Sequence, residues 1–239
     1  MARSIYIASP NAGTGKSTVA LGLVSCLTKV VAKVGVFRPF VESREGDAFL
    51  SLLLNRAGST TPPEQCVGAT WDEFHADPEE ALARIVDAYR AMAREHDVVI
   101  IDGSDFTDVA GNPELALNAR VAANIGVPVL LVVSGQSDVE DVVASVEVSM
   151  AEIADNHART VAVVANKCLP ETRQAVGEAL TAIEGITSTT LPEVPLLAAP
   201  VVREVLDAVE GTLIAGDETL LDREAESVLV CAMDVSHVL

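Results

Sequence analysis

Short apolar runs alternate along the chain with longer segments in which apolar residues recur at helical spacing. Runs of this kind are typical of strands that are buried on both faces of a sheet. Their alternation with helices predicts βα units around one mostly parallel central sheet, an α/β fold with three layers. The five clearest runs are SIYIAS (4–9), KVGVF (33–37), DVVIID (97–102), VPVLLVV (127–133) and TVAVVAN (160–166).

Residues typical of helix ends lie between these runs. Asp77, Asn112 and Ser137 stand where a short polar side chain caps the first turn of a helix, and prolines follow the first two of them. Gly126 directly precedes the fourth apolar run and is expected to end a helix. The sequence therefore predicts helices that begin near residues 78, 113 and 138 and fill the spaces between strands.

The last fifty residues divide into two parts. Residues 186–215 predict a last short strand, a proline-rich turn and a closing helix. Residues 216–239 carry a fresh strand signal, ESVLVCAM (226–233), before the sequence ends. We therefore predict a nucleotide-binding domain over residues 1–215, and a linker with the start of a following, truncated domain over residues 216–239. The alternative is that 226–233 adds an edge strand to the first sheet.

The composition and net charge disfavour some classes of partner and location. Of the 239 residues, 49% are hydrophobic, and 35 acidic residues against 16 basic ones give a formal charge of −19. This charge argues against nucleic acid or an anionic membrane as the main partner. The four cysteines are widely spaced and form no CxxC pair, which favours free thiols. With no apolar run long enough for a signal peptide or a membrane span, the expected location is the cytoplasm.

The segment SPNAGTGKST, residues 9–18, predicts a phosphate-binding loop between the first strand and a helix. In such a loop, backbone N–H groups curl around the β-phosphate, a lysine reaches the β and γ oxygens, and a serine or threonine hydroxyl binds Mg²⁺. The residues expected to surround the nucleotide here are Asn11, Ala12, Gly13, Thr14, Gly15, Lys16, Ser17 and Thr18.

Pro10 occupies the position of the first glycine of this motif. Proline has no N–H, and its φ is fixed near −65°, so it cannot supply the conformation of that glycine. The later part of the loop, which lies nearest the phosphates, is intact. We therefore expect ATP binding, and the alternative is a degenerate loop that only connects strand to helix. Asn11 stands where a dimerising subgroup of such ATPases carries a lysine, which disfavours that subgroup.

Two carboxylates are candidates for a magnesium site with Ser17. Asp102 ends the third apolar run, and Asp47 follows the second one in GDAFL; Asp105 is a weaker third candidate. Mg²⁺ bound to a nucleotide is usually held by one or two carboxylates, directly or through water. The alternatives are a solvated carboxylate at a strand end for Asp102, and a helix-terminal charge for Asp47.

Two further candidate side chains stand at the ends of predicted strands. Arg38 follows the second run at the carboxyl edge of the sheet, where open α/β sheets bind ligands, so it is expected either to contact an anionic ligand or to form an ion pair. Asn166 ends the fifth run, where its amide could face a purine base. Because Leu169 and not an aspartate follows, guanine specificity has no support, and the expected cofactors are ATP and Mg²⁺.

Three stretches together resemble a known family: IYIASPNAGTGKSTVALGLV, VGVFRPF and LNARVAANIGVPVLLVVSG. They look like the amino-terminal domain of long-form bacterial phosphate acetyltransferases. That domain is similar in fold to dethiobiotin synthetase and to cobyrinic acid a,c-diamide synthases. The resemblance covers residues 3–215, and the tail with VLVCAM is similar to the opening of the middle domain of those enzymes.

The resemblance implies a role for each site residue. Lys16, Ser17 and Thr18 would hold phosphates and metal, Asp47 and Asp102 would complete the magnesium sphere, and Asn166 would face adenine. Two departures concern the substrate half of the synthetase site. Arg38 replaces a substrate-contacting lysine, and the loop Glu-Gly-Ala-Gly-Gly is replaced by residues 102–106, DGSDF.

Three functional hypotheses follow. The first is a regulatory or assembly domain whose catalytic partner, the domain that exchanges acetyl between coenzyme A and phosphate, follows in the same polypeptide. This chain would then be at most a weak ATPase. The second is an ATP-dependent ligase of dethiobiotin synthetase or cobyrinic acid a,c-diamide synthase type. The third is a structural domain with a vestigial loop. The resemblance also implies self-association into a homo-oligomer.

Overall fold

A computed structural model describes residues 3–104 and 114–225 of the chain. It divides into two compact units, Met1–Pro192 and Glu193–Leu239, which are considered separately below. Within the described residues, no helix combines the length and the apolar character needed to cross a bilayer.

The first unit is built on a seven-stranded sheet with the order β3-β2-β4-β1-β5-β6-β7. Each neighbouring pair is parallel, as the apolar runs predict. The strands are β1 (Arg3–Ala8), β2 (Val34–Val41), β3 (Val67–Thr70), β4 (Val98–Asp102), β5 (Val129–Ser134), β6 (Thr160–Cys168) and β7 (Thr187–Pro192). The expected three-layer α/β fold is confirmed.

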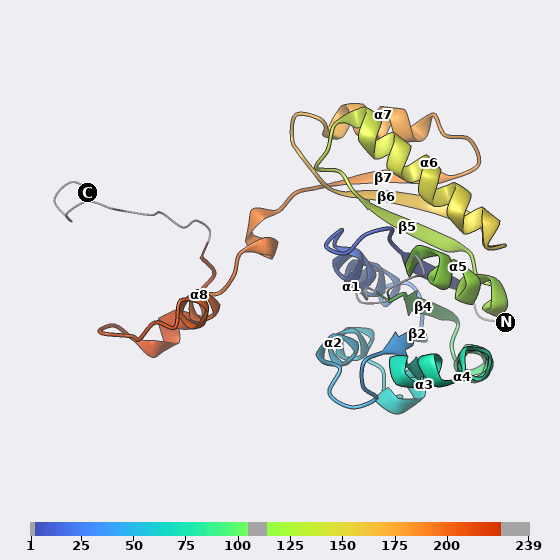
Figure 1. The fold of residues 1–239 in the computed structure, drawn as a ribbon, viewed down its shortest axis with the longest axis horizontal. Coiled ribbons are helices and arrows are strands. Elements are labelled where there is room, and N and C mark those ends of the chain that lie inside the picture. Colours follow the sequence, from blue (N-terminus) through green and yellow to red (C-terminus); the bar gives the residue numbers. More distant parts are fainter. Residues whose placement is uncertain (1–2, 105–113, 226–239) are drawn as a thin grey trace. The chain divides into compact units, whose positions relative to one another are not determined.

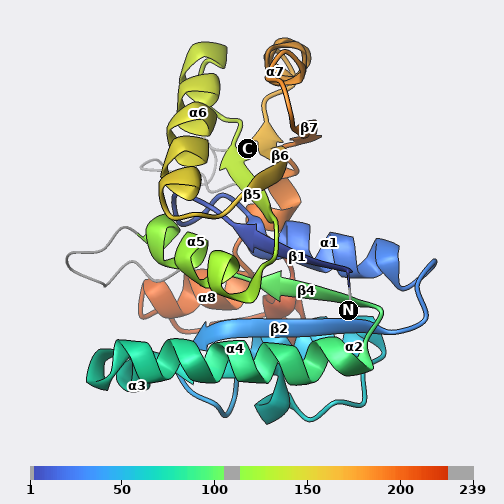
Figure 2. The ribbon, with the colours of Figure 1, turned by 90° about the vertical axis from the view of Figure 1, so that its right-hand side faces the viewer.

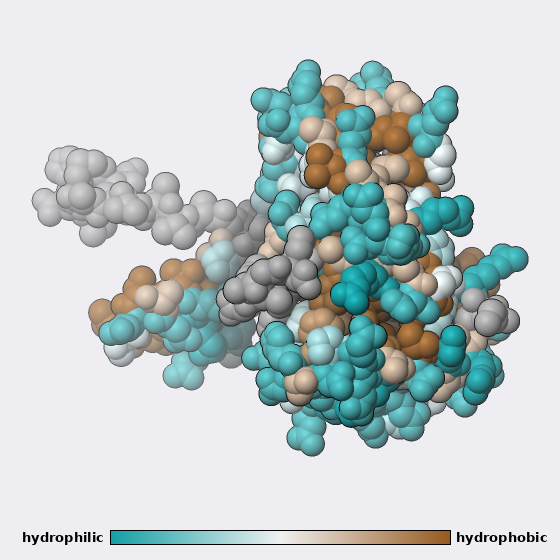
Figure 3. All heavy atoms as spheres, turned by 45° about the vertical axis from the view of Figure 1, so that its right-hand side comes forward, coloured by the Kyte–Doolittle hydropathy of each residue, from teal (hydrophilic) through white to brown (hydrophobic). Residues whose placement is uncertain are grey.

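Helices cover both faces of this sheet (Figure 1), and hydrophilic residues occupy much of the face shown in Figure 3. Contacts join α1 to α2 on one face, whereas α4, α5, α6 and α7 contact one another in succession on the other (Figure 2). This division follows from right-handed crossovers between parallel strands. The helices are α1 (Lys16–Leu27), α2 (Ala48–Ala57), α3 (Trp71–Ala76), α4 (Pro78–Glu95), α5 (Glu114–Ile125), α6 (Val139–Asp155) and α7 (Arg173–Thr181), with a 3-10 turn at Pro63–Cys66.

Two of the predicted helix ends are confirmed. The Asp77 side chain accepts a hydrogen bond from the N–H of Glu80, and Pro78 is the first residue of α4. Gly126 takes a φ of 71° directly after α5, and this left-handed conformation lets its N–H donate to the Ala123 carbonyl.

The other two predicted helix starts have different outcomes. Ser137 is not the N-cap of α6, because the helix begins one residue later and Asp138 holds that position without a side-chain cap. Acidic residues in the first turn, Glu140 and Asp141, complement the helix dipole instead. Asn112 lies outside the described residues.

An aromatic cluster anchors the β3 edge of the sheet. The rings of Phe40 and Trp71 stack with centroids 4.7 Å apart, and Phe74 meets both rings edge-on. Burial of such rings contributes roughly 1.5–3 kcal/mol each. This cluster holds α3 against the sheet, so these aromatics act in packing.

The elements of the second unit that lie within residues 193–225 are short. After β7 come a 3-10 turn at Pro195–Ala198, helix α8 (Val202–Ala208) and a further turn at Glu218–Asp222. Arg203 pairs with Asp222 at 2.9 Å. The predicted last strand, proline-rich turn and closing helix are all present. The strand predicted at 226–233 lies outside the described residues.

Candidate phosphate-binding site

The glycine-rich loop lies at the carboxyl end of β1, near the middle of the sheet. From β1 the chain crosses through α1 to β2 on one side, whereas β4 crosses through α5 to β5 on the other. The strand order therefore reverses next to β1. Open α/β sheets bind ligands at such a switch point, outside the carboxyl ends of the strands.

Two glycines give this loop its curl. Gly13 and Gly15 have φ values of 74° and 81°, a left-handed conformation that residues with a side chain rarely adopt. Gly15 is the N-cap of α1, and the first hydrogen bond of the helix runs from the N–H of Val19 to the Gly15 carbonyl. The N–H groups of Lys16, Ser17 and Thr18 precede that bond and take no part in the helical ladder, which makes them donors for an anion.

Lys16 turns back from the first turn of α1 toward the end of β4. Its Nζ donates to Asp102 Oδ1 at 2.7 Å and to the Gly103 carbonyl at 2.5 Å. The two side chains are 1% and 0% exposed, so this ion pair is fully buried. A buried pair of this kind requires close partners to offset the cost of removing both charges from water.

Arg38 joins the two acidic residues predicted for the metal site. Its Nη1 pairs with Asp47 Oδ2, and its Nε lies 3.4 Å from Asp102 Oδ2. Asp47 also accepts a hydrogen bond from the Leu50 N–H at 2.8 Å and so caps α2. Lys16, Arg38, Asp47 and Asp102 are thus two cations and two anions contributed by the described residues, and their formal charges cancel.

The chemistry of this set fits a magnesium ion bound together with a nucleotide. A hydroxyl and two carboxylates are oxygen ligands of the kind that Mg²⁺ prefers, and Asp102 Oδ2 is buried and receives no hydrogen bond from a described residue. Among the described residues, no three His, Cys, Asp or Glu side chains converge to hold a metal by themselves. Phosphate oxygens would have to complete the site.

The end of β6 closes the loop from the other side. Asn166 Nδ2 donates to the Thr14 carbonyl at 2.9 Å, and a Cβ at Gly15 would lie only 2.3 Å from that nitrogen. Lys167, with a φ of 58°, donates through Nζ to the Gly13 carbonyl at 2.7 Å. The sequence predicts Asn166 as a contact to a purine base. Lys167 is not among the predicted site residues, although its position near the end of a strand is the signal that could identify it.

A buried polar group behind the site was also missed. Tyr6 donates its hydroxyl to Asn118 Oδ1 at 2.7 Å, and the N–H of Ser104 donates to the same oxygen at 3.0 Å. Burial, with smaller contributions from Asp102 and Glu114, raises the pKa of Tyr6, which keeps the hydroxyl protonated as a donor. This group fixes the backbone just after Asp102.

The remaining residues of the phosphate loop differ in exposure. Asn11, Ala12 and Thr18 are exposed, whereas Thr14 is buried under Asn166. The structure thus brings the predicted residues from the first strand, β2, β4 and β6 to one edge of the sheet. Asp105 lies outside the described residues.

The parallel sheet, the glycine loop and the lysine at the start of α1 define a P-loop type of α/β protein. A family described as "AAA domain" matches residues 3–205. The chain therefore belongs to this family.

Two proteins with curated names resemble the chain along most of its length. A phosphate acetyltransferase from Synechocystis is 24% identical over 251 residues, which cover all of this chain but 36% of that protein. A hydrogenobyrinate a,c-diamide synthase from Streptomyces coelicolor is 28% identical over 204 residues, which cover 82% of the chain and 37% of that protein. The resemblance to the P-loop domain of long-form phosphate acetyltransferases is thus confirmed.

A solved structure shows the same fold. It is a plasmid partition protein from Borrelia burgdorferi, bound to AMPPNP, which matches this chain with a TM-score of 0.57 and 14% sequence identity. The match covers 92% of this chain and 94% of that protein. At this identity the similarity concerns the fold.

Proposed function

We propose that this chain is an ATP-binding domain that regulates, or supports the assembly of, a phosphate acetyltransferase. The observation that carries the proposal is the loop of Gly13 and Gly15, both in the left-handed conformation, at the start of α1, with the Lys16 ammonium beside it. Anions bind at such helix starts because the N–H groups and the helix dipole both favour negative charge.

In this proposal the chain's own groups hold the triphosphate. The N–H groups of residues 13–18 bind the β-phosphate, and Lys16 exchanges its contact with Asp102 for phosphate oxygens. Ser17, Asp47 and Asp102 would hold Mg²⁺, which supplies positive charge to the phosphates when bound. The side-chain oxygen Oδ1 of Asn166 is the proposed acceptor for the amino group of adenine, because Nδ2 of the same amide already donates to the loop.

The regulatory part of the proposal rests on the relatives. The chain spans about a third of the length of the phosphate acetyltransferase that it resembles, 36%. In this proposal a transferase domain lies in the same polypeptide and responds to nucleotide bound to the present domain. The protein acts in the cytoplasm as a homo-oligomer. Such coupling between two sites typically amounts to about 1–3 kcal/mol.

A second function is favoured by one specific observation. The relative with the higher identity of the two is a hydrogenobyrinate a,c-diamide synthase. An ATP-dependent ligase would use the same phosphate loop but would need a substrate site beside it. Arg38 would have to contact an anionic substrate there, yet in the structure it is engaged by Asp47 and Asp102.

The test uses the protein encoded by the complete reading frame. Acetyl transfer from acetyl-CoA to phosphate is measured with and without ATP and Mg²⁺, in the wild type, in Lys16→Ala and in the control Lys29→Ala. The proposal predicts that ATP changes the rate or the oligomer in the wild type and the control but not in Lys16→Ala. ATP-dependent consumption of an amine or carboxylate substrate by the isolated chain, without any effect of ATP on transfer, would favour the ligase.

A further inference from the structure

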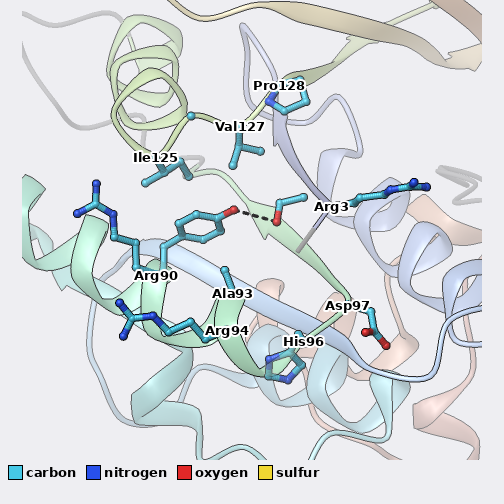
Figure 4. Close-up of a pocket in the computed structure, with 12 residues that line it drawn as sticks. Arg3, Arg90, Ala93, Arg94, His96, Asp97, Ile125, Val127 and Pro128 are labelled. Carbon is cyan, nitrogen blue, oxygen red and sulfur yellow. Dashed lines mark hydrogen bonds between the residues drawn. The ribbon is translucent and has the colours of Figure 1, made fainter. Parts of the chain in front are cut away.

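A second candidate site lies at the opposite edge of the sheet from the glycine loop. A pocket of about 1090 Å³ opens where β1 and β4 begin, between α4 and the turn that joins α5 to β5 (Figure 4). Its walls come from Arg3 and Ser4, from one face of α4, and from residues 125–128. It therefore shares no residue with the phosphate loop.

The charge of this pocket is opposite to that of the chain. Arg3, Arg90 and Arg94 line it, together with one acidic residue, Asp97. In a chain with 35 acidic and 16 basic residues, three arginines around one pocket are unusual. Arg90 and Arg94 are one helical turn apart and extend in the same direction from α4 (Figure 4).

These arginines are not used in ion pairs within the described part of the chain. None of the ion pairs there includes Arg3, Arg90 or Arg94, whereas Arg84 on the same helix pairs with both Glu73 and Glu80. Asp97 is engaged by the backbone, since its Oδ2 accepts from the Lys33 N–H at 3.2 Å. The guanidinium groups thus leave a surplus of positive charge and of hydrogen-bond donors.

The floor of the pocket is apolar and held in place. Tyr89 donates its hydroxyl to Ser4 Oγ at 2.9 Å, which fixes the ring at the base, and the tyrosine is 7% exposed. Ala93, Ile125 and Val127 complete this surface. Ligand sites commonly combine an apolar floor with a few polar groups that orient the ligand.

Together these features point to a binding site for a small organic anion, and we propose that the pocket takes a phosphate or carboxylate attached to an apolar body. The arginines of α4 bind the anionic group, and the body lies against Tyr89 and its apolar neighbours. Arginine matches the geometry of phosphate and carboxylate with paired N–H donors. This pocket and its ligand are separate from the phosphate loop and the nucleotide of the proposed function.

The test uses 1-naphthyl phosphate as the probe, titrated into the chain by calorimetry at low ionic strength. The double variant Arg90→Gln/Arg94→Gln is compared with Arg84→Gln, an arginine of the same helix outside the pocket. We expect the double variant to bind the probe at least about tenfold more weakly, and Arg84→Gln to change affinity by less than about twofold. Equal binding by the double variant and the wild type would overturn the proposal.

Further measurements distinguish binding in this pocket from binding at the phosphate loop, and test the role of the apolar floor. Lys16→Ala should keep probe binding, and the double variant should keep ATP binding, so the failure of one site leaves the other testable. Inorganic phosphate should bind more weakly than the probe, and equal affinity would overturn the role of the apolar floor. Ala93→Glu places a negative charge in the pocket wall and should abolish binding, with thermal unfolding checked for each variant.

Discussion

Lys16 Nζ and Asp102 Oδ1 lie 2.7 Å apart at the centre of the carboxyl edge of the sheet, and water reaches neither side chain. Arg38 extends this pair to Asp47, so that the four charges neutralise one another. A triphosphate that enters the loop must compete with Asp102 for Lys16. Among the described residues the opposite charges of the site balance one another, and the charge of the ligand alters that balance.

Removal of Arg38 should make nucleotide binding more dependent on Mg²⁺. Among the described residues, Arg38→Gln leaves Lys16 as the cation paired with these carboxylates, and Asp47 and Asp102 would both repel a free triphosphate. Mg²⁺ replaces the lost charge and binds the released oxygens. The ratio of the Kd for ATP alone to the Kd with Mg²⁺ should rise roughly tenfold, or about 1.4 kcal/mol, as measured by calorimetry.

Arg56→Gln is the matched control for this measurement. Arg56 lies in the last turn of α2 and its Nε donates to Ser25 Oγ at 2.5 Å, away from both carboxylates. Its substitution should leave the ratio unchanged. An unchanged ratio in Arg38→Gln as well would contradict the role given to Arg38.

Gly103 should not tolerate a side chain. A Cβ at this position would lie 2.6 Å from the Ile7 carbonyl oxygen and 2.6 Å from Asn118 Oδ1, and the first of these is backbone that cannot turn away. Gly103→Ala should lower the free energy of unfolding by roughly 1–3 kcal/mol. Gly22→Ala, in open space on α1, should raise it by up to about 1 kcal/mol. Urea denaturation of both variants measures the difference, which would be absent if the backbone after β4 were free to shift.

Asn118 should contribute more to stability than an exposed asparagine of the same helix. Asn118→Ala would leave the Tyr6 hydroxyl and the Ser104 N–H buried without their acceptor, at a cost of about 2–4 kcal/mol. Asn124 is exposed and its side chain donates to the Arg120 carbonyl one turn earlier, so Asn124→Ala should cost less than about 0.5 kcal/mol. Similar free energies of unfolding for the two variants would show that the Tyr6 group finds other partners.

Glu73 gives the stability a defined pH dependence. The N–H of Thr70, which donates to Glu73 Oε2, lowers the pKa of this carboxyl, and Arg44 at 2.8 Å adds to the effect. The charged form therefore stabilises the folded chain above the unfolded pKa of about 4.3, and this stabilisation is lost as the pH falls through the folded value.

Glu73→Gln should consequently be less stable than the wild type at pH 7, by about 1 kcal/mol from the weakened cap. The difference should shrink as the pH falls below 4 or thereabouts. Denaturation midpoints from pH 7 to pH 3 measure it, with the exposed Glu171→Gln as the control. A difference that stays constant with pH would contradict the charge-based account.

The strands and helices of the sheet core could be predicted from sequence because their apolar runs are long and bounded by turns. Strand β3 could not, since VGAT has four residues and no distinctive periodicity. Its place depends on tertiary contacts: it pairs with β2, and a Cβ at Gly68 would lie 2.6 Å from the Pro39 carbonyl oxygen and 2.5 Å from Ile85. Such close approach is not visible in a local pattern.

The candidate site could likewise be predicted only in part from the sequence. Strand ends indicated which residues share one edge of the sheet, and the structure places Lys16, Arg38 and Asp102 together there. The hydrogen-bond and ion-pair partners of each side chain were not predictable, because they depend on strand order and on the direction of each side chain. Asn166 and Lys167 bond carbonyls of the glycine loop for this reason, at a distance of about 150 residues in sequence.

The most direct test of the account is calorimetric titration of ATP with Mg²⁺ into the chain, its Lys16→Ala variant and the exposed control Lys29→Ala. Loss of the lysine should weaken binding roughly 100-fold, because a charge-assisted contact to the phosphates is removed. The account predicts saturable binding at one site in the wild type and in Lys29→Ala, and binding weakened by that factor in Lys16→Ala. No binding by the wild type, or equal binding by Lys16→Ala, would contradict it.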